Sequence, residues 1–200
     1  MKICTYFTEG VYEQIANDLV IPSAKRVGLN LTQIKVNSEH SWKKNTCLKA
    51  SVIKKAINDF NDDIVMIDAD ATFEKSPELF FQIPSDFDIA YHDFDSGLFW
   101  RGKSEGKKHL ASGTLLIRNK PICRELLDDW IEENERNPQI LEQLNLDKLV
   151  KNKYKDLLKA YQLPIEYLAI INKDGVVPSF IKEPVIVHHQ ASRNTKRMEL

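Results

Sequence analysis

The chain has 200 residues, 42% hydrophobic and 28% charged, which suits one good-sized globular domain with a substantial core. A net charge of −1 argues against a general nucleic-acid binder, because such proteins usually carry a clear basic excess. No segment approaches the roughly 20 consecutive apolar residues that span a bilayer, and the amino end lacks the long apolar stretch of a signal peptide. Three widely spaced cysteines without a C-x-x-C pair are typical of reduced thiols. We therefore expect a soluble protein of the cytoplasm.

The first part of the chain alternates between predicted strands and helices. Apolar patterns predict strands over residues 2–7 and 29–36. A helix is expected over residues 11–27, with Pro22 as a point where it can break. A second helix is expected over residues 42–60, because its apolar side chains fall on one stripe.

An apolar run over residues 64–67 ends in two acids and is the central feature of the sequence. Four apolar residues in a row are typical of a strand buried on both faces. Asp68 and Asp70 follow, separated by one alanine. A buried strand rarely ends in carboxylates unless a cation meets them, since burying an unpaired carboxylate is costly. Ligands of open α/β sheets bind at the carboxyl ends of the strands, so the two acids can surround one divalent ion there.

A helix start and two further strands are predicted after the acid pair. Ser76 and Pro77 form a typical start, an N-cap followed by proline at the first helical position. Residues 87–91 and 110–117 are expected to be strands. The polar, glycine-containing residues 92–108 between them are expected to form an irregular, mobile loop.

The last part of the chain completes the alternation of helices and strands. An amphipathic helix is predicted over residues 121–134 and a further helix over residues 139–150. Residues 163–171 are expected to be extended, and residues 185–187 to form the last strand. Strands that alternate with helices predict a single α/β domain over residues 1–200, with a largely parallel sheet covered on both sides.

The end of the last predicted strand completes the proposed ion site. His188 and His189 follow it, and only one of them is expected to bind, because neighbouring strand residues point to opposite faces. We expect His188 to join Asp68 and Asp70 around Mn²⁺ or Mg²⁺, and the nitrogen ligand favours Mn²⁺. A metal held in this way can neutralise a diphosphate leaving group. The basic candidates to share that charge are Lys49, Arg193 and Lys196.

Several short blocks follow one another along nearly the whole chain. They are Thr5-Tyr6-Phe7-Thr8-Glu9-Gly10-Val11-Tyr12, Lys49, Asp68-Ala69-Asp70, Ser76-Pro77-Glu78-Leu79-Phe80, Leu110-Ala111-Ser112-Gly113-Thr114-Leu115, Glu142-Gln143 with Asn145, Leu163-Pro164-Ile165-Glu166-Tyr167 and Val187-His188-His189. In order and spacing, these blocks resemble glycosyltransferases of the GT-A fold, in particular the glycogenin-like and bacterial galactosyltransferase-like group.

This resemblance implies a GT-A fold, a Rossmann-like α/β/α sandwich with a mostly parallel mixed sheet. It implies a metal-dependent transfer of a sugar from a nucleoside diphosphate sugar, expected to be UDP-linked, to a hydroxyl of a saccharide or another acceptor. The cofactor would be Mn²⁺ or Mg²⁺, held by Asp68, Asp70 and His188. The donor-binding residues would be Thr5, Tyr6, Phe7, Tyr12, Lys49, Asp68, Ser112, Gly113 and Arg193.

The stereochemical outcome of the transfer stays open at this stage. The resemblance implies that Glu142 and Gln143 lie near the anomeric carbon, as suits retention of configuration. If the configuration inverts instead, Asp93 or Asp95 of the expected loop is available as general base for the acceptor hydroxyl.

The sequence departs from the family pattern at three places. Ala111 stands where asparagine is usual, so one contact to the donor sugar is lost. Glu142 stands where aspartate is usual. Residues 191–194 replace a terminal glycine and a Lys-Pro-Trp pattern, which leaves Arg193 as the expected phosphate ligand.

The same stretch of sequence is also compatible with other functions. Asp68 and Asp70 after an apolar strand also fit a haloacid-dehalogenase-type phosphatase, with Asp68 as nucleophile and Asp70 as acid and base. Such an enzyme needs a further acid pair at a strand end, whereas Asp128 and Asp129 lie within a predicted helix. A nucleotide-sugar-binding protein without catalysis is a third possibility. The simplest alternative is that the two acids only cap the turn that follows them.

Overall fold

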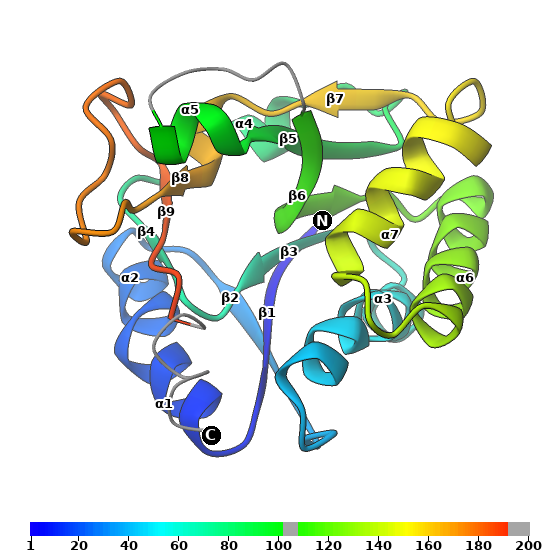
Figure 1. Cartoon of the computed structure of the whole chain (residues 1–200), viewed down its shortest axis with the longest axis horizontal. Coiled ribbons are helices and arrows are strands. Elements are labelled where there is room, and N and C mark those ends of the chain that lie inside the picture. The colour runs from blue at the N-terminus through cyan, green and yellow to red at the C-terminus, as the bar shows by residue number, and fades with distance from the viewer. Residues whose placement is uncertain (102–107, 192–200) are drawn as a thin grey trace.

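The computed structural model describes residues 1–101 and 108–191, and within them strands and helices alternate along most of the chain (Figure 1). The strands are β1 (Lys2–Thr8), β2 (Leu31–Val36), β3 (Ile64–Asp68), β4 (Ala71–Phe73), β5 (Ile89–Asp95), β6 (Lys108–Ile117), β7 (Ala160–Gln162), β8 (Ala169–Ile170) and β9 (Ile186–His188). The helices are α1 (Val11–Asp18), α2 (Val20–Arg26), α3 (Trp42–Phe60), α4 (Leu79–Gln82), α5 (Ser96–Arg101), α6 (Pro121–Arg136) and α7 (Glu142–Lys148). A π-helical turn (Leu149–Lys153) and a 3₁₀ helix (Ile165–Leu168) complete the set.

The main sheet is mixed and mostly parallel, as the sequence predicts. Its strand order is β2-β1-β3-β6-β5-β7. Strand β1 runs parallel to β2 and β3, and β5 runs parallel to β7, whereas β6 is antiparallel to both of its neighbours. A small second sheet has the order β4-β9-β8. Strand β9 pairs with β4 so that His188 lies opposite Ala71. The carboxyl end of β9 therefore lies next to the turn that follows β3.

Helices cover both faces of the main sheet, α1 and α2 on one side and α3, α6 and α7 on the other (Figure 1). The side chains of β3 alternate between the two cores. Ile64 and Met66 pack with α3 and α6, and Val65 and Ile67 pack with α1, α2 and the small sheet. All four are 0% exposed. The prediction of a central strand buried on both faces is therefore confirmed, and it explains why β3 is apolar until its last residue.

Several predicted boundaries are wrong. The expected helix over residues 11–27 is two helices that meet at Leu19. Pro22 lies in the first turn of α2, where its missing N–H has no intrahelical partner in any case. The helix expected from Pro77 begins only at Leu79, because Ser76 donates its hydroxyl hydrogen to the Glu78 carboxylate and caps no backbone N–H.

The segment expected as an irregular loop over residues 92–108 is partly regular. Strand β5 continues through Asp95 and α5 follows, while residues 102–107 lie outside the described residues. The Asp95 carboxylate accepts the N–H of Leu98, and the rings of Phe94 and Phe99 pack 4.9 Å apart. These contacts support a helical turn over Ser96–Arg101, inside the segment expected as a loop.

The last expected segments also differ in detail. The helix expected from residue 139 begins at Glu142 and passes into the π-helical turn. The stretch expected as extended over residues 163–171 contains the 3₁₀ helix, in which the Tyr167 hydroxyl accepts the N–H of Leu79. Cys4, Cys47 and Cys123 are free thiols, as expected. Among the described residues, none of the helices combines the length and the apolar character that crossing a membrane requires.

Candidate functional site

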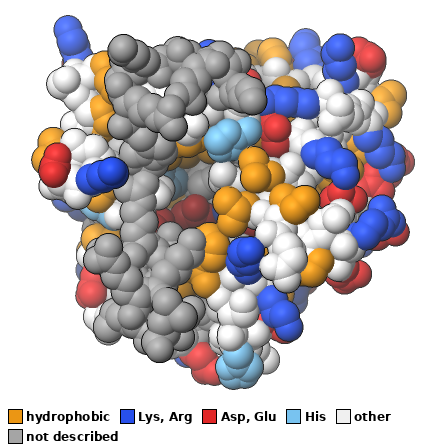
Figure 2. Space-filling view, viewed as in Figure 1, with side chains coloured by type: hydrophobic (Ala, Val, Ile, Leu, Met, Phe, Trp, Pro, Cys, Tyr) orange, Lys and Arg blue, Asp and Glu red, His pale blue; other side chains and the backbone are white. Residues whose placement is uncertain are grey.

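A cavity of about 370 Å³ opens at the carboxyl ends of β1 and β3. Figure 2 shows a hollow on this face with acidic side chains at its bottom and hydrophobic side chains on one rim. The residues that line the cavity come from β1, α1, α3, β3 and the turn after it, β5, β6, β8, and from α7 and β9 with their flanking residues. They are Tyr6, Phe7, Thr8, Tyr12, Trp42, Asn45, Thr46, Lys49, Asp68, Ala69, Asp70, Phe94, Ala111, Ser112, Leu141, Glu142, Gln143, Ile170, His188 and Gln190.

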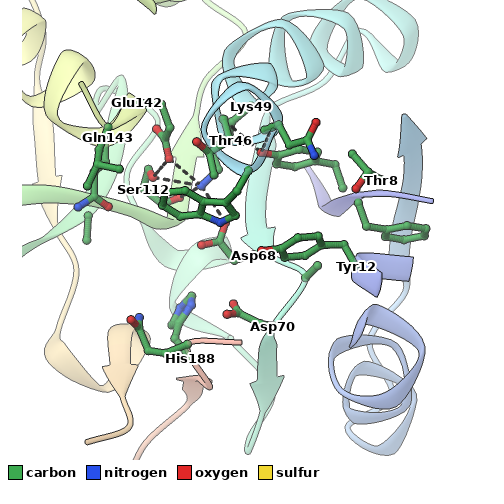
Figure 3. A pocket seen from close by; sticks show the side chains of 18 of the residues that line it. Thr8, Tyr12, Thr46, Lys49, Asp68, Asp70, Ser112, Glu142, Gln143 and His188 are labelled. Atoms are coloured by element: carbon green, nitrogen blue, oxygen red, sulfur yellow. Dashed lines mark hydrogen bonds and ion pairs between the residues drawn. The ribbon is translucent and has the colours of Figure 1, made fainter. Parts of the chain in front are cut away.

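Asp68, Asp70 and His188 form a cluster at the middle of the cavity. One ligand atom from each of them lies within 4.8 Å of the others, and Figure 3 shows the three side chains facing a common space. Asp68 ends β3, Asp70 lies in the turn before β4, and the β4–β9 pairing brings His188 against this turn. The N–H of Ala191 fixes Asp70 by donating to its Oδ2 at 2.8 Å.

The surroundings of this cluster suit a divalent metal. Burial, reinforced by repulsion from Asp68, raises the pKa of Asp70 to about 6, so a cation bound beside Asp70 would stabilise its charged form. Burial lowers the pKa of His188 to about 4, which keeps its imidazole neutral at pH 7, the form that binds metals. Nε2 of His188 lies 2.9 Å from the hydroxyl of Thr114, so the second ring nitrogen, Nδ1, is left for an ion.

Gly113 provides the space that the cluster needs. A Cβ atom at this position would lie 2.9 Å from Cε1 of His188 and 3.1 Å from Oδ2 of Asp68. Any larger residue would therefore clash with His188 and Asp68, two of the three candidate metal ligands. Gly113, expected to border the donor sugar, does not itself line the cavity.

His189 lies apart from the cluster. Its Nε2 is 2.9 Å from the hydroxyl of Thr72. Among the described residues, the cluster that could hold a metal ion does not include His189. The two neighbouring histidines therefore have different partners, in line with the alternation that the sequence suggests.

Lys49 links the cluster of Asp68, Asp70 and His188 to Glu142. Its Nζ donates to Oδ1 of Asp68 at 2.7 Å and to the carbonyl and hydroxyl oxygens of Ser112 at 3.1 Å each. It also lies 3.3 Å from Oε1 of Glu142. Burial alone would lower the pKa of Lys49, but Asp68 and Glu142 raise it above its ordinary value. Lys49 is therefore a permanent cation inside the site.

Glu142 is the second buried acid of this network. Its Oε1 accepts the hydroxyl hydrogen of Ser112 at 2.6 Å, and burial raises the pKa of its carboxyl group. Its Oε2 has no hydrogen-bond partner among the described residues. A buried carboxylate oxygen without a partner is costly. Glu142 lines the cavity, but this oxygen itself has almost no accessible surface.

Part of the cavity lining is aromatic. Phe7 of β1, Tyr12 of α1 and Trp42 at the start of α3 contribute to it. The Tyr6 hydroxyl lies 3.2 Å from the carbonyl oxygen of Asn45, so it fixes α3 against β1. Figure 3 places Thr8 and Tyr12 on one side of the acid pair and Glu142 and Gln143 on the other.

Most of the predicted site residues line one cavity, but among the described residues Thr5, Asp93, Asp95 and Gly113 do not. Thr5 is fully buried outside the lining, and its hydroxyl has no partner within the described part of the chain. Asp95 is 3% exposed and borders a different hollow, near His92 and Leu163. It therefore does not lie beside Asp68, Asp70 and His188. Gly113 lies behind the cluster. Arg193 and Lys196 fall outside the described residues.

Sequence reasoning missed several lining residues. Trp42, Asn45 and Thr46 precede Lys49 at helical spacing, so the face of α3 that carries Lys49 could have indicated them. Phe94 and Ile170 lie in segments predicted as a loop and as an extended stretch, and no sequence signal places them at the site.

Comparison with protein families identifies the class of enzyme to which this fold belongs. Residues 21–200 match the model for the nucleotide-diphospho-sugar transferases. The chain therefore belongs to the nucleotide-diphospho-sugar transferase family and is a glycosyltransferase. Among curated proteins, none matches the chain significantly.

Solved structures share the fold at low sequence identity. A glycosyltransferase involved in glycosylation of the major capsid of PBCV-1 has a TM-score of 0.69 and 15% identity, with 100% of each chain covered. The bifunctional glycosyltransferase WbbM has a TM-score of 0.58 and 13% identity, over 95% of this chain and 45% of that one. Mouse xyloside xylosyltransferase 1 has a TM-score of 0.54 and 11% identity, over 96% of this chain and 98% of that one. At these identities the likeness concerns the GT-A-like fold.

Proposed function

We propose that this glycosyltransferase uses Mn²⁺ and a UDP-linked donor, and transfers the donor sugar to a hydroxyl of a saccharide or another acceptor. The observation that carries the proposal is the convergence of Asp68, Asp70 and His188 inside the cavity. Two carboxylates and one neutral imidazole suit Mn²⁺ and leave positions for phosphate oxygens. Mg²⁺ is the second choice because it prefers an all-oxygen shell.

The metal would neutralise the diphosphate as its bond to the anomeric carbon breaks. Asp68, Asp70 and His188 would hold it in the middle of the cavity. The aromatic part of the lining, with Phe7, Tyr12 and Trp42, would bind the base and ribose. Ser112, Glu142 and Gln143, on the other side of the cluster, would then face the sugar. This order along the cavity matches the order of groups in a nucleoside diphosphate sugar.

The contacts of Lys49 change its proposed role. An ammonium group has three hydrogens, and those of Lys49 have acceptors on Asp68 and Ser112. We therefore assign Lys49 to positioning Asp68 and Glu142, and no longer to direct contact with the nucleotide. Arg193 stays a prediction as the phosphate ligand.

Glu142 and Gln143 remain the proposed residues near the anomeric carbon. The amide of Gln143, which lines the cavity, would hydrogen-bond to a sugar hydroxyl and so orient the sugar against the acceptor. Asp95 is no longer proposed as general base, because it borders a different hollow. The proposal leaves retention and inversion to be decided by product analysis.

Family membership favours the transferase over the phosphatase. A thermal-shift experiment tests the choice, because a ligand that binds only the native state must stabilise it. UDP with Mn²⁺ should raise the melting temperature, and Asp70→Asn should remove the Mn²⁺-dependent part of the shift. Asp86→Asn, the same change at an exposed carboxylate, is the matched control and should leave the shift intact. A shift with a phosphomonoester analogue and Mg²⁺ but none with UDP would contradict the proposal.

A further inference from the structure

Among the described residues, three apolar side chains form one wall of the cavity. Phe94 of β5, Ala111 of β6 and Ile170 of β8 line it. All three belong to the hydrophobic cluster beneath the small sheet, together with Leu168 and Val187. They are 8%, 5% and 6% exposed. Most of each side chain therefore packs within the hydrophobic cluster, and only a small part of it borders the cavity.

The neighbouring wall has the opposite chemistry. Ser112 and Glu142 hydrogen-bond to each other there, and Oε2 of Glu142 has no partner within the described residues. Gln143 adds an amide, which can donate and accept hydrogen bonds. A sugar between the two walls therefore meets hydrogen-bonding groups on one edge and hydrocarbon on the other.

A hydroxyl pressed against the apolar wall would lose its hydrogen bonds to water without replacement. A C–H or methyl group in the same place would gain contact with Phe94, Ala111 and Ile170. Resting on the function proposed above, we propose that the donor sugar is a deoxy sugar, in which one hydroxyl of the parent sugar is replaced by hydrogen at the edge that faces these three residues.

The size of the expected preference follows from the type of wall. Apolar pockets discriminate against an added hydroxyl by up to about a hundredfold. Sites built to hydrogen-bond a hydroxyl discriminate more strongly against its loss, because their own polar groups are left without partners. Removing a hydroxyl should thus improve binding at one ring position and weaken it at the positions that face Glu142 and Gln143.

Donor binding without acceptor tests this directly, because acceptor contacts do not enter. UDP-glucose, UDP-galactose and their monodeoxy analogues would compete with UDP for the protein in the presence of Mn²⁺. We expect one analogue to bind about ten- to a hundredfold more tightly than its parent, and analogues deoxygenated at other positions to bind more weakly.

Two substitutions locate the effect at the apolar wall. Ala111→Ser and Ile170→Thr each place a hydroxyl there, and each should reduce the preference for the deoxy donor. Ala160→Ser, at an exposed position of β7, is the matched control and should leave the preference unchanged. Because the wild-type protein is measured first, the inference stays testable even if a wall variant fails to fold.

The possible failures can be told apart. If UDP binds with Mn²⁺ but every deoxy analogue binds as its parent does or more weakly, the deoxy-sugar inference is wrong and the proposed function stands. A preference that Ala111→Ser and Ile170→Thr leave untouched would also overturn it, since the wall would not be its cause. If UDP does not bind with Mn²⁺, the proposed function itself fails and the inference falls with it.

Discussion

Nζ of Lys49 lies 2.7 Å from Oδ1 of Asp68, so a buried cation of the protein already touches one of the carboxylates proposed to hold the metal. The same ammonium group lies 3.3 Å from Oε1 of Glu142. Lys49 thereby ties the acid at the end of β3 to the acid at the start of α7. The metal end and the sugar end of the cavity are coupled through one side chain.

Lys49→Met should destabilise the protein and abolish donor binding. The substitution leaves Glu142 buried and without its cation, and breaking a buried ion pair from one side costs about 3–5 kcal/mol. We expect about 3 kcal/mol, at the low end, because the side chain of Asp68 is 35% exposed and water screens part of its charge. Urea unfolding at pH 7 measures the loss.

Two further variants make the Lys49 experiment decisive. Lys55→Met removes a lysine from an exposed pair with Asp59 and should change stability little. Adding Glu142→Gln to Lys49→Met should recover part of the stability, because the buried charge is gone, but should not recover donor binding. Equal losses for Lys49→Met and Lys55→Met would contradict the role of Lys49 as a buried positioning cation.

Thr114→Val should weaken Mn²⁺ binding by about tenfold, within the range found when a partner of a metal-binding histidine is removed. The substitution keeps the shape of the side chain and removes the hydroxyl that lies 2.9 Å from Nε2 of His188. Titration with Mn²⁺, followed by the electron paramagnetic resonance of the free ion, measures the change.

Thr72→Val is the matched control for Thr114→Val. It removes the corresponding hydroxyl beside His189, also at 2.9 Å, and should leave Mn²⁺ affinity unchanged. The pair therefore separates the two histidines. If Thr72→Val weakened Mn²⁺ binding and Thr114→Val did not, His189 would be the ligand and our assignment of His188 would be wrong.

Gly113→Ala should reduce Mn²⁺ affinity more than it reduces stability. Its new Cβ atom would meet Cε1 of His188 at 2.9 Å, so the imidazole has to move. Displacing a ligand by a few tenths of an ångström should cost roughly ten- to a hundredfold in metal affinity, comparable to the loss of a supporting hydrogen bond. Mn²⁺ titration and thermal unfolding of the same sample compare the two effects. Unchanged affinity would show that His188 does not bind the ion.

Glu133→Gln should destabilise the protein more at pH 7 than at pH 3. Glu133 pairs with Lys148 at 2.5 Å and so connects α6 to α7, the helix that carries Glu142. The hydrogen bond and charge of Lys148 hold the pKa of Glu133 below its ordinary value of 4.5. Because the pKa is lower in the folded state, the stabilisation is fully present above pH 4.5 and is lost as the pH falls through the folded-state pKa.

Urea unfolding at the two pH values tests this dependence. Glu132→Gln changes an exposed neighbour that pairs with Arg136 and serves as the control, with little expected effect at either pH. A destabilisation by Glu133→Gln that is the same at pH 3 and pH 7 would show that packing, and not the charge of Glu133, accounts for it.

The sequence predicts the parts of the fold that have a strong local signal. The helix over residues 42–60 is confirmed, because its apolar stripe meets the sheet as periodicity predicts. The strand over residues 64–67 and its acid pair are confirmed as neighbours of His188, although 118 residues separate Asp70 from His188. Both the histidines at the end of the last predicted strand and the resemblance to a known family indicated that pairing.

Features that depend on tertiary contacts escape sequence reasoning. The α5 turn is held by the packing of Phe99 on Phe94, and its six residues are too few to show a helical pattern. The three acceptors of Lys49 come from β3 and β6, so their meeting depends on β6 lying antiparallel next to β3. The apolar wall likewise combines three strands from two sheets. Asp95 was misplaced because its segment looked like an open loop, whereas it is a buried strand end.

A crystal soaked with UDP and MnCl₂ tests the central claim most directly. Anomalous diffraction at the manganese edge locates the ion without any assumption about the protein's function. The account predicts one manganese peak in the space shared by Asp68, Asp70 and His188, with the diphosphate of UDP beside it and the uracil toward Tyr12. A manganese peak elsewhere, or UDP bound in the cavity with no manganese at these three residues, would contradict it.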